Sequence, residues 1–309
     1  MKVAYSTFSC LIVDDIVFPD GQTRMNVLGG GLHALTGMRV WSDSVGIAAA
    51  VGHDLDEQHR EGLQAFGVDI SGLVRREELR TARSWQLFET NGHRTEILRT
   101  DRAIFTERKV QFEDLPDAYL DAKGYHVQWG RPEELPELLS KLRAASPSAK
   151  LVMELTYPKG DVPHSVWRQI MSQLSLISPD REEATTITGL SDPLQSCRML
   201  LDWGAPLVAL RMGAEGSILM DGTGRSWHLP AVPTNIVDVT GGGNSYCGGF
   251  TVGLGEGLDP VEAALRAVVS ASFALEQIGT PSWDDSQPAE ALRRLDWARQ
   301  RVEEIANSA

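Results

Sequence analysis

The chain has 309 residues and a formal net charge of −13, because 42 acidic residues outnumber 29 basic ones. Its 42% of hydrophobic and 23% of charged residues are typical of a globular protein with a sizeable core. The excess of acidic residues argues against binding to nucleic acid or to an anionic membrane, since both need clustered Lys and Arg. A bound phosphate would therefore be held locally, by backbone N–H groups or a metal ion.

Apolar runs of strand length alternate along the chain with amphipathic patterns, which predicts a mostly parallel sheet flanked by helices. The expected strands are Val3–Val13, Val45–Val51, Tyr125–Gln128, Leu151–Leu155, Leu174–Ser178, Leu207–Arg211 and Gly216–Met220. The expected helices between them are Leu55–Phe66, Pro132–Ala144, Val166–Leu174 and Ser191–Trp203. No internal repeat or flexible linker separates these segments, so we expect one domain over residues 1–309.

The first apolar run also resembles a signal peptide, but we interpret it as a core strand. Ser and Thr interrupt Val3–Val13, two aspartates follow at once, and no A-x-A cleavage site occurs. The three cysteines, Cys10, Cys197 and Cys247, lie far apart and lack zinc-site spacing. No run of about 18 apolar residues suggests a membrane span. These features predict a protein of the reduced cytoplasm.

One segment departs from the alternation of strands and helices. Between Thr81 and Leu98 the residues alternate around Thr90-Asn91-Gly92-His93, and Asn-Gly in such a context is a strong hairpin signal. We therefore expect a small β-lid, made of residues from about 14–28 and 80–100, that lies apart from the main sheet. Such a lid would exclude water from a transfer reaction, and the alternative is an ordinary surface hairpin with an apolar underside.

The clearest helical pattern follows near the C-terminus, over Asp259–Ile278. Asp259 can cap this helix, Pro260 suits its first position, and Gly279 can end it. Its apolar residues recur every three to four positions, so this helix is expected to pack in the core.

The most informative stretch is residues 238–250, which read Asp-Val-Thr-Gly-Gly-Gly-Asn-Ser-Tyr-Cys-Gly-Gly-Phe. Three successive glycines let several backbone N–H groups converge on one point. A helix of small residues is expected to begin near Asn244, which adds the positive end of its dipole. Together these features predict an anion hole suited to a transferring phosphoryl group. The alternative is a flexible glycine loop before a tightly packed helix.

Five short motifs occur along the chain in the same order as in one known protein family. Residues 238–244 resemble the C-terminal signature D-x-T-G-A-G-D of the ribokinase-like (PfkB) sugar kinases. Gly29-Gly30-Gly31 resembles the family's N-terminal glycine motif, and residues 51–69 resemble its V-G-x-D…L…G-V-D run. Residues 180–183 stand where the family has N-x-x-E, and residues 213–216 where it has G-x-x-G. The resemblance implies a ribokinase-like three-layer α/β sandwich with a mostly parallel central sheet and a small β-lid.

The resemblance implies roles for residues on the substrate side of the site. Asp14, at the end of the first strand, would hold substrate hydroxyls, and a solvated strand end is the alternative. Gly30 and Gly31 would let the substrate approach the backbone, or they form a simple turn. The Asn that the family has in G-G-x-x-x-N falls at Ala34, so one expected contact is missing.

On the nucleotide side, the resemblance implies contacts from Asp180, Thr240, Gly213 and Gly216, the two glycines also suiting a tight turn. Glu183 would orient Mg²⁺ and its waters near the phosphates. The spacing of Asp180 and Glu183 is also that of a capping box at the start of a helix, and both roles are compatible. The histidines His33 and His126 are better explained as ordinary buried or surface residues than as site residues.

Position 244 departs from the family pattern. The family has an Asp there that accepts the proton of the substrate hydroxyl, and this chain has Asn244. An amide does not accept a proton near neutral pH, so general-base help, worth about 10²–10⁴-fold, should be lost. Positioning and charge stabilisation dominate phosphoryl transfer, however. Asn244 is therefore still expected to line the catalytic centre with Gly241, Gly242 and Gly243.

Two classes of function follow. The first is an ATP- and Mg²⁺-dependent phosphotransferase acting on a hydroxymethyl group of a sugar or nucleoside. The second is a non-kinase homologue that binds a nucleotide or a phosphorylated sugar or nucleoside, either regulatory or repurposed for hydrolysis. Lids of this family often pair between subunits, which implies a homodimer through the β-lid. Residues 14–21 and 270–277 look most like a divergent branch that includes fungal maintenance-of-killer proteins.

Overall fold

An eleven-stranded sheet lies at the centre of the computed structural model, which describes residues 2–90, 94–100, 102–128, 131–155 and 162–306. The strands follow the order β15-β14-β13-β12-β11-β10-β9-β1-β4-β5, and β6 also pairs with β4. Neighbours from β12 to β5 and β6 are parallel, whereas β13, β14 and β15 pair antiparallel. The mostly parallel sheet expected from the sequence is thus confirmed. The strand bounds are β1 Tyr5–Phe8, β4 Val45–Gly52, β5 Val68–Asp69, β6 Leu73–Arg76, β9 Gly124–Gln128, β10 Lys150–Glu154, β11 Leu176–Ser178, β12 Leu207–Arg211, β13 Ser217–Asp221, β14 Ser226–Leu229 and β15 Glu303–Ile305.

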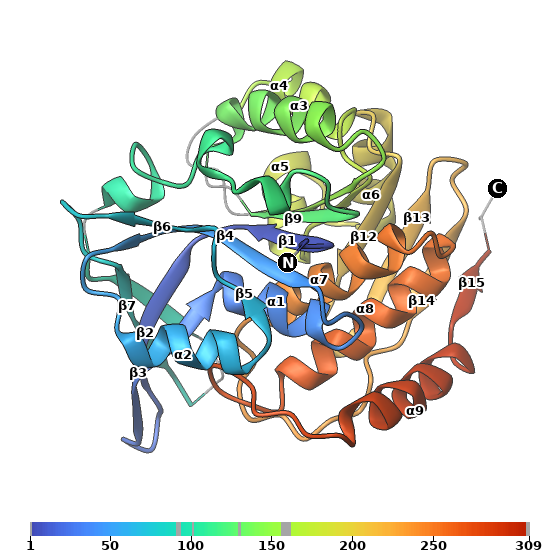
Figure 1. Cartoon of the computed structure of the whole chain (residues 1–309). Helices are drawn as coiled ribbons and strands as arrows, with labels where there is room; N and C mark the ends of the chain where they lie inside the picture. Colours follow the sequence, from blue (N-terminus) through green and yellow to red (C-terminus); the bar gives the residue numbers. More distant parts are fainter. Residues whose placement is uncertain (1, 91–93, 101, 129–130, 156–161, 307–309) are drawn as a thin grey trace.

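Helices cover both faces of this sheet and give the molecule three layers (Figure 1). Helices α3 to α6 pack on one face, and α1, α7 and α8 pack on the other, each against buried apolar clusters. The four helices expected between the strands correspond to α2, α3, α4 and α6. Within the described residues, no helix combines the length and the apolar character that a bilayer crossing needs. The helix bounds are α1 Gly31–Arg39, α2 Glu57–Ala65, α3 Leu135–Ala145, α4 His164–Met171, α5 Arg181–Thr188, α6 Pro193–Asp202, α7 Gly242–Gly255, α8 Pro260–Ala274 and α9 Gln287–Arg299.

A second sheet of four strands, here called the lid sheet, has the order β3-β2-β7-β8. Its strands are β2 Leu11–Val17, β3 Thr23–Gly30, β7 Ala82–Phe88 and β8 Arg94–Leu98. The predicted hairpin is confirmed, because β7 and β8 pair antiparallel from Ser84 opposite Leu98 to Phe88 opposite Arg94. Its expected Asn-Gly turn at 91–92 lies outside the described residues.

The prediction of one strand over Val3–Val13 is wrong. The chain forms β1 in the central sheet, leaves it at Ser9 and Cys10, and enters the lid sheet as β2. The Cys10 carbonyl accepts a hydrogen bond from the Gly31 N–H at 2.7 Å, next to the first pair of the lid sheet, Leu11 opposite Gly30. The hydrophobic pattern hides this break because residues on both sides of it are buried. Asp14 therefore lies within a lid strand and not at the end of the first strand.

The C-terminal helix begins as predicted but ends early. The Asp259 carboxylate accepts hydrogen bonds from the backbone of Val261 and Glu262, and Pro260 is the first helical residue. The helix ends at Ala274 and not at Ile278, because the Leu275 carbonyl accepts N–H groups from the loop before α7. The expected β-lid over residues 14–28 contains most of β3. Strands β5, β6, β14 and β15 and helices α1 and α9 were not among the expected elements.

Candidate active site

The site is built around the amino terminus of α7, a buried helix of 14 residues. Gly241 is its N-cap and has a left-handed backbone (φ 77°), which a glycine adopts without strain. A Cβ at this position would lie 2.0 Å from Cγ of His33, so the close approach also requires glycine. Gly242 and Gly243 already lie in the helix, so the bend expected over three glycines is confined to Gly241. The first N–H groups of α7 lack partners within the helix and can bind an anion.

A buried ion network supports this helix from the side. Arg211, at the end of β12, places Nη1 3.2 Å from Oε1 of Glu154 and Nη2 3.0 Å from Oε2 of Glu183. The Asn244 amide donates its Nδ2 hydrogen to Oε2 of Glu154, at the end of β10. Gly243 is packed on Arg211 so closely that a Cβ would lie 1.5 Å from Nη1. The carboxyl ends of β10 and β12 thus meet at the start of α7, the edge where parallel sheets bind ligands.

Burial and charge set the protonation of the two carboxylates differently. Burial raises the pKa of Glu183 to about 7, although Arg211 favours the charged form. Burial also opposes the charge of Glu154, but Arg211 and His126 outweigh it and hold the pKa of Glu154 below its usual value. Glu183 has a structural role as well, since Asp180 and Glu183 each bind the other's backbone N–H at 2.8 Å. The predicted capping box at the start of α5 is therefore confirmed.

A cavity of about 1080 Å³ separates the lid sheet from the start of α7. Residues from both halves of the predicted site line it, namely Asp14, Gly30, Thr240, Gly241 and Asn244. On its lid side, Ser84 and Gln86 donate hydrogen bonds to Oδ1 of Asp14, and burial raises the pKa of Asp14. Arg94 of β8 reaches across and donates to Thr240 Oγ1 at 3.3 Å. Asp14 is 5% exposed, which excludes a solvated strand end.

The glycines at the start of α1 lie in a tight, closely packed turn. Gly30 has φ 64°, and a Cβ there would lie 2.5 Å from the Cys10 carbonyl oxygen. Gly31 begins α1 beside it. Gly213 and Gly216 form the turn between β12 and β13, where both have positive φ, and they do not line the cavity below the lid sheet.

Sequence reasoning missed several residues of this region. Glu154 and Arg211 are charged residues at the ends of predicted strands. A charged residue in this position can indicate a site, so the sequence could have identified both. The sequence favours an ordinary buried or surface role for His33, but the residue lines the cavity beside Gly241. His126 is fully buried, with Nε2 3.5 Å from Glu154 and Nδ1 2.9 Å from Thr7 Oγ1.

Two clusters of side chains near α7 offer donor atoms to a metal ion, and they differ in how well they suit one. His126, Glu154 and Cys247 have ligand atoms within 4.8 Å of one another. Burial raises the pKa of the Cys247 thiol and Arg211 already neutralises Glu154, so this cluster opposes a cation. Glu183 and Asp180 offer carboxylate oxygens, the donors that Mg²⁺ prefers. Arg211 also binds Glu183, but only through Oε2, which, within the described part of the chain, leaves Oε1 of Glu183 and Oδ2 of Asp180 as the oxygens for an ion.

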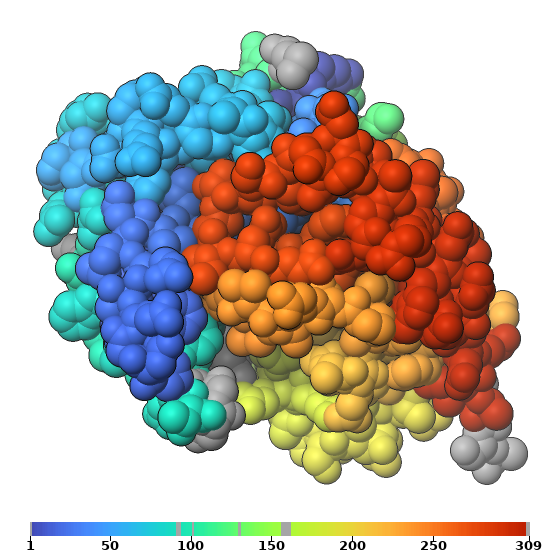
Figure 2. All heavy atoms as spheres, turned by 90° about the horizontal axis from the view of Figure 1, so that it is seen from below, coloured from blue at the N-terminus to red at the C-terminus, as the bar shows by residue number. Residues whose placement is uncertain are grey.

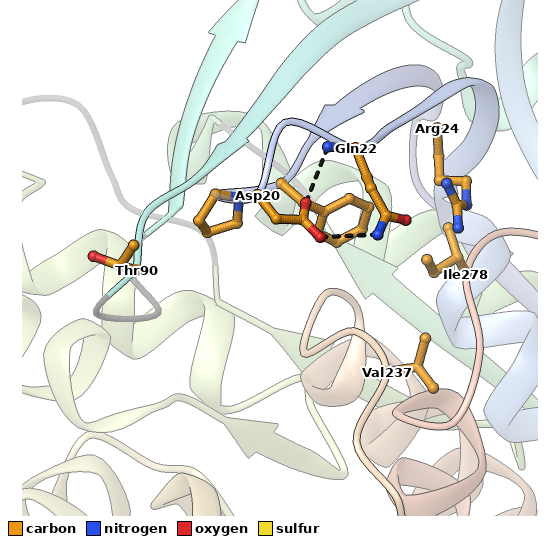
Figure 3. Close-up of a pocket in the computed structure, with 8 residues that line it drawn as sticks. Asp20, Gln22, Arg24, Thr90, Val237 and Ile278 are labelled. Atoms are coloured by element: carbon orange, nitrogen blue, oxygen red, sulfur yellow. Dashed lines mark hydrogen bonds between the residues drawn. The ribbon is translucent and has the colours of Figure 1, made fainter.

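A second cavity, of about 530 Å³, lies at the tip of the lid sheet. Asp20 and Gln22 line it from the turn after β2, where Asp20 accepts hydrogen bonds from the Gln22 backbone and side chain (Figure 3). Val237 and Ile278 line its other side (Figure 3). In Figure 2, which shows the molecule from below, blue N-terminal residues lie directly beside orange and red C-terminal residues. The loop before α7 thus contributes to both cavities.

Comparisons with known proteins agree with this geometry. The family model of the pfkB family carbohydrate kinases matches residues 11–286. Cytidine kinase of Thermococcus kodakarensis is 30% identical over 257 residues, which cover 82% of this chain and 89% of that protein. A nucleoside kinase of Methanothermobacter thermautotrophicus is 25% identical over 310 residues, covering 96% and 94% of the two chains. The structure of Arabidopsis thaliana ribokinase complexed with ribose and ATP has the same fold, with a TM-score of 0.75 at 15% identity over 96% of this chain and 99% of that one. This chain therefore belongs to the pfkB family of carbohydrate kinases.

Proposed function

We propose that the protein transfers the γ-phosphoryl group of ATP to a hydroxymethyl group of a nucleoside or a sugar. The single observation that carries this proposal is one cavity with a fixed carboxylate, Asp14, on one side and the amino terminus of α7 on the other. The names of two relatives, a cytidine kinase and a nucleoside kinase, support a nucleoside as the first acceptor to test.

Asp14 suits the acceptor end of this cavity. Its Oδ1 is held by Ser84 and Gln86, which fixes the direction of the carboxylate. Its Oδ2 lies against Gly29, where a Cβ would come within 2.4 Å, so only a glycine leaves this oxygen in place. A vicinal diol would donate its two hydroxyl hydrogens to such a carboxylate.

The phosphate end is the start of α7. The N–H groups of Gly242, Gly243 and Asn244 would stabilise the charge on the transferring phosphoryl group. Arg94, which donates a hydrogen bond to Thr240, adds a positive charge at the rim. Asp180, Gly213 and Gly216 would contact or border the nucleotide beyond it.

Mg²⁺ fits the oxygen donors at the start of α5. Glu183 would hold the ion through its waters, with Asp180 beside it, and the ion supplies charge that neutralises the β- and γ-phosphates. In a chain of charge −13, such a cation would also offset the general repulsion of a polyphosphate.

Asn244 favours a second candidate function, in which the pocket binds or hydrolyses a nucleotide or a phosphorylated compound. Its Nδ2 is committed to Glu154, so Oδ1 is the atom left to accept a hydrogen bond from a hydroxyl or a water. Asn244 can orient either group but cannot take its proton.

Measurement of ADP formation from ATP over a panel of nucleosides and sugars separates these functions, with Asn244→Asp run beside the natural chain. Acceptor-dependent turnover by the natural chain is the expected result. A silent natural chain together with an active Asn244→Asp variant would favour the second candidate. If neither protein binds nucleotide in a thermal-shift assay, both candidates are wrong.

The remaining predictions about the protein are part of the same proposal. The lid sheet would close over the acceptor, and its outer face would pair with a second copy of the chain. A single domain over residues 1–309, a cytoplasmic location and a place in the branch of the fungal maintenance-of-killer proteins stay predictions.

A further inference from the structure

The proposed reaction needs a group that accepts the proton of the acceptor hydroxyl, and Asn244 cannot provide it. The carboxylates near α7 are already engaged. Asp238, in the loop before α7, accepts the Thr240 N–H and does not line the cavity. Glu154 binds Arg211 through Oε1 and Asn244 through Oε2, and Oε2 of Glu183 accepts from Arg211 and from the Asp180 backbone. A different side chain must therefore face the reacting hydroxyl.

His33 is the side chain that spans the two ends of the site. The Cγ and Nδ1 atoms of its ring lie next to Gly241, because a Cβ added to Gly241 would be 2.0 Å from Cγ and 2.3 Å from Nδ1. Its Nε2 lies toward Gly29, where a Cβ would be 3.4 Å from it and 2.4 Å from Oδ2 of Asp14. The ring thus extends from the anion-binding end of α7 to the carboxylate proposed to hold the acceptor.

The position of His33 is fixed while its ring stays available. Its backbone carbonyl accepts a hydrogen bond from Ser245 Oγ, which ties α1 to α7. Within the part of the chain that the structure describes, neither ring nitrogen forms a hydrogen bond, and the ring lines the cavity. Burial lowers the pKa of His33 to about 4, and Asp238 and Glu154 only partly oppose this. The imidazole is therefore neutral at pH 7 and keeps one unprotonated nitrogen.

We propose that His33 is the general base of the transfer, in place of the aspartate that position 244 lacks. The acceptor's hydroxyl proton moves to the unprotonated ring nitrogen, and the oxygen's electron pair forms the bond to the γ-phosphorus. The bond from that phosphorus to the β,γ-bridging oxygen breaks, and its electron pair leaves with ADP. The imidazolium then releases its proton to water. The inference rests on the proposed kinase function.

Four variants test it together: His33→Gln, Asn244→Asp, the double variant, and His53→Gln as an exposed control histidine outside the cavity. For His33→Gln we expect kcat to fall about 10²–10⁴-fold. Its KM for ATP and its unfolding midpoint should stay close to those of the natural chain. The double variant should regain the activity of Asn244→Asp alone, because an aspartate at 244 makes His33 dispensable. His53→Gln should behave as the natural chain.

The outcomes that overturn the inference are distinct from failure of the proposed function. If the natural chain turns over and His33→Gln is equally active, His33 is not the base. If His33→Gln is inactive and Asn244→Asp does not rescue it, His33 acts through structure alone, and the inference is again wrong. Should the natural chain transfer no phosphoryl group to any acceptor, the proposed function fails, and the inference fails with it.

Discussion

Glu183 carries a pH-dependent contribution to the stability of the fold. Its pKa in the folded chain is about 7, above the usual 4.5, so folding favours the protonated carboxyl. This contribution is fully present below pH 4.5 and is lost as the pH rises through 7. Glu183→Gln should remove the dependence and keep the capping box, since Gln also serves at that position.

The measurement is the thermal unfolding midpoint from pH 5 to pH 8 in metal-free buffer. We expect the midpoint of Glu183→Gln to rise relative to the natural chain across this range. Glu182→Gln, which changes an exposed neighbour in the same first turn, is the matched control and should show no such trend. A constant difference between Glu183→Gln and the natural chain would contradict the assigned pKa.

Residue roles were predictable from the sequence where both partners lie close along the chain. The capping box needs only Asp180 and Glu183, three positions apart, and the structure contains it. Glu154 and Arg211 are 57 positions apart, and only the folding of the sheet brings them together. His33 was missed for the same reason, because its neighbours Gly241 and Asp14 come from other elements.

At the scale of elements, the crossing of α1 and α7 places His33 beside the anion-binding end. A Cβ on Gly37 would lie 1.9 Å from the Ser245 carbonyl oxygen, and one on Gly248 would lie 2.1 Å from the Ala34 carbonyl oxygen. Each helix thus presents a glycine to the backbone of the other. Such an approach leaves no room for even a methyl group.

Gly37→Ala should therefore destabilise the protein by about 1–3 kcal/mol, the usual range for overpacking. Gly62→Ala, in α2, is the matched control, because nothing lies within 4 Å of its Cβ position. There the alanine should stabilise by up to about 1 kcal/mol through helix propensity. Urea denaturation followed by circular dichroism measures both, and equal effects of the two substitutions would contradict the packing described.

The strands and helices show where hydrophobic patterns suffice. Strands β4, β9, β10, β11 and β12 were predicted because each is a short apolar run bounded by turns, whereas the short parallel strands β5 and β6 were not predicted. The boundary inside Val3–Val13 was not, since β1 and β2 are buried in different sheets and the pattern is continuous. Helix α1 was missed because it begins with glycine and contains another, which propensity disfavours and packing on α7 requires.

At the scale of the whole molecule, the outer face of the lid sheet carries exposed apolar side chains. Trp85 on β7 and Ile97 on β8 are directly opposite each other and are 42% and 41% exposed. Arg99 stacks on Trp85, with its guanidinium carbon 4.7 Å from the ring centroid. Exposed apolar side chains that lie side by side in this way are typical of a surface that binds another protein.

If two copies pair through this face, light scattering after size-exclusion chromatography should give the mass of a dimer. Trp85→Glu should then give a monomer, because a carboxylate would be buried without a partner. Leu292→Glu changes a 58% exposed apolar residue on α9 and should leave the dimer intact. A monomeric natural chain, or a dimeric Trp85→Glu variant, would exclude this interface.

The most direct test of the central claim is ³¹P NMR of the purified natural chain with ATP, Mg²⁺ and a nucleoside or sugar acceptor. We expect a phosphomonoester signal to grow in step with the ADP signals, and to stop when EDTA removes the metal ion. If ATP stays intact with every acceptor, or if only inorganic phosphate forms, the claim of phosphoryl transfer is contradicted.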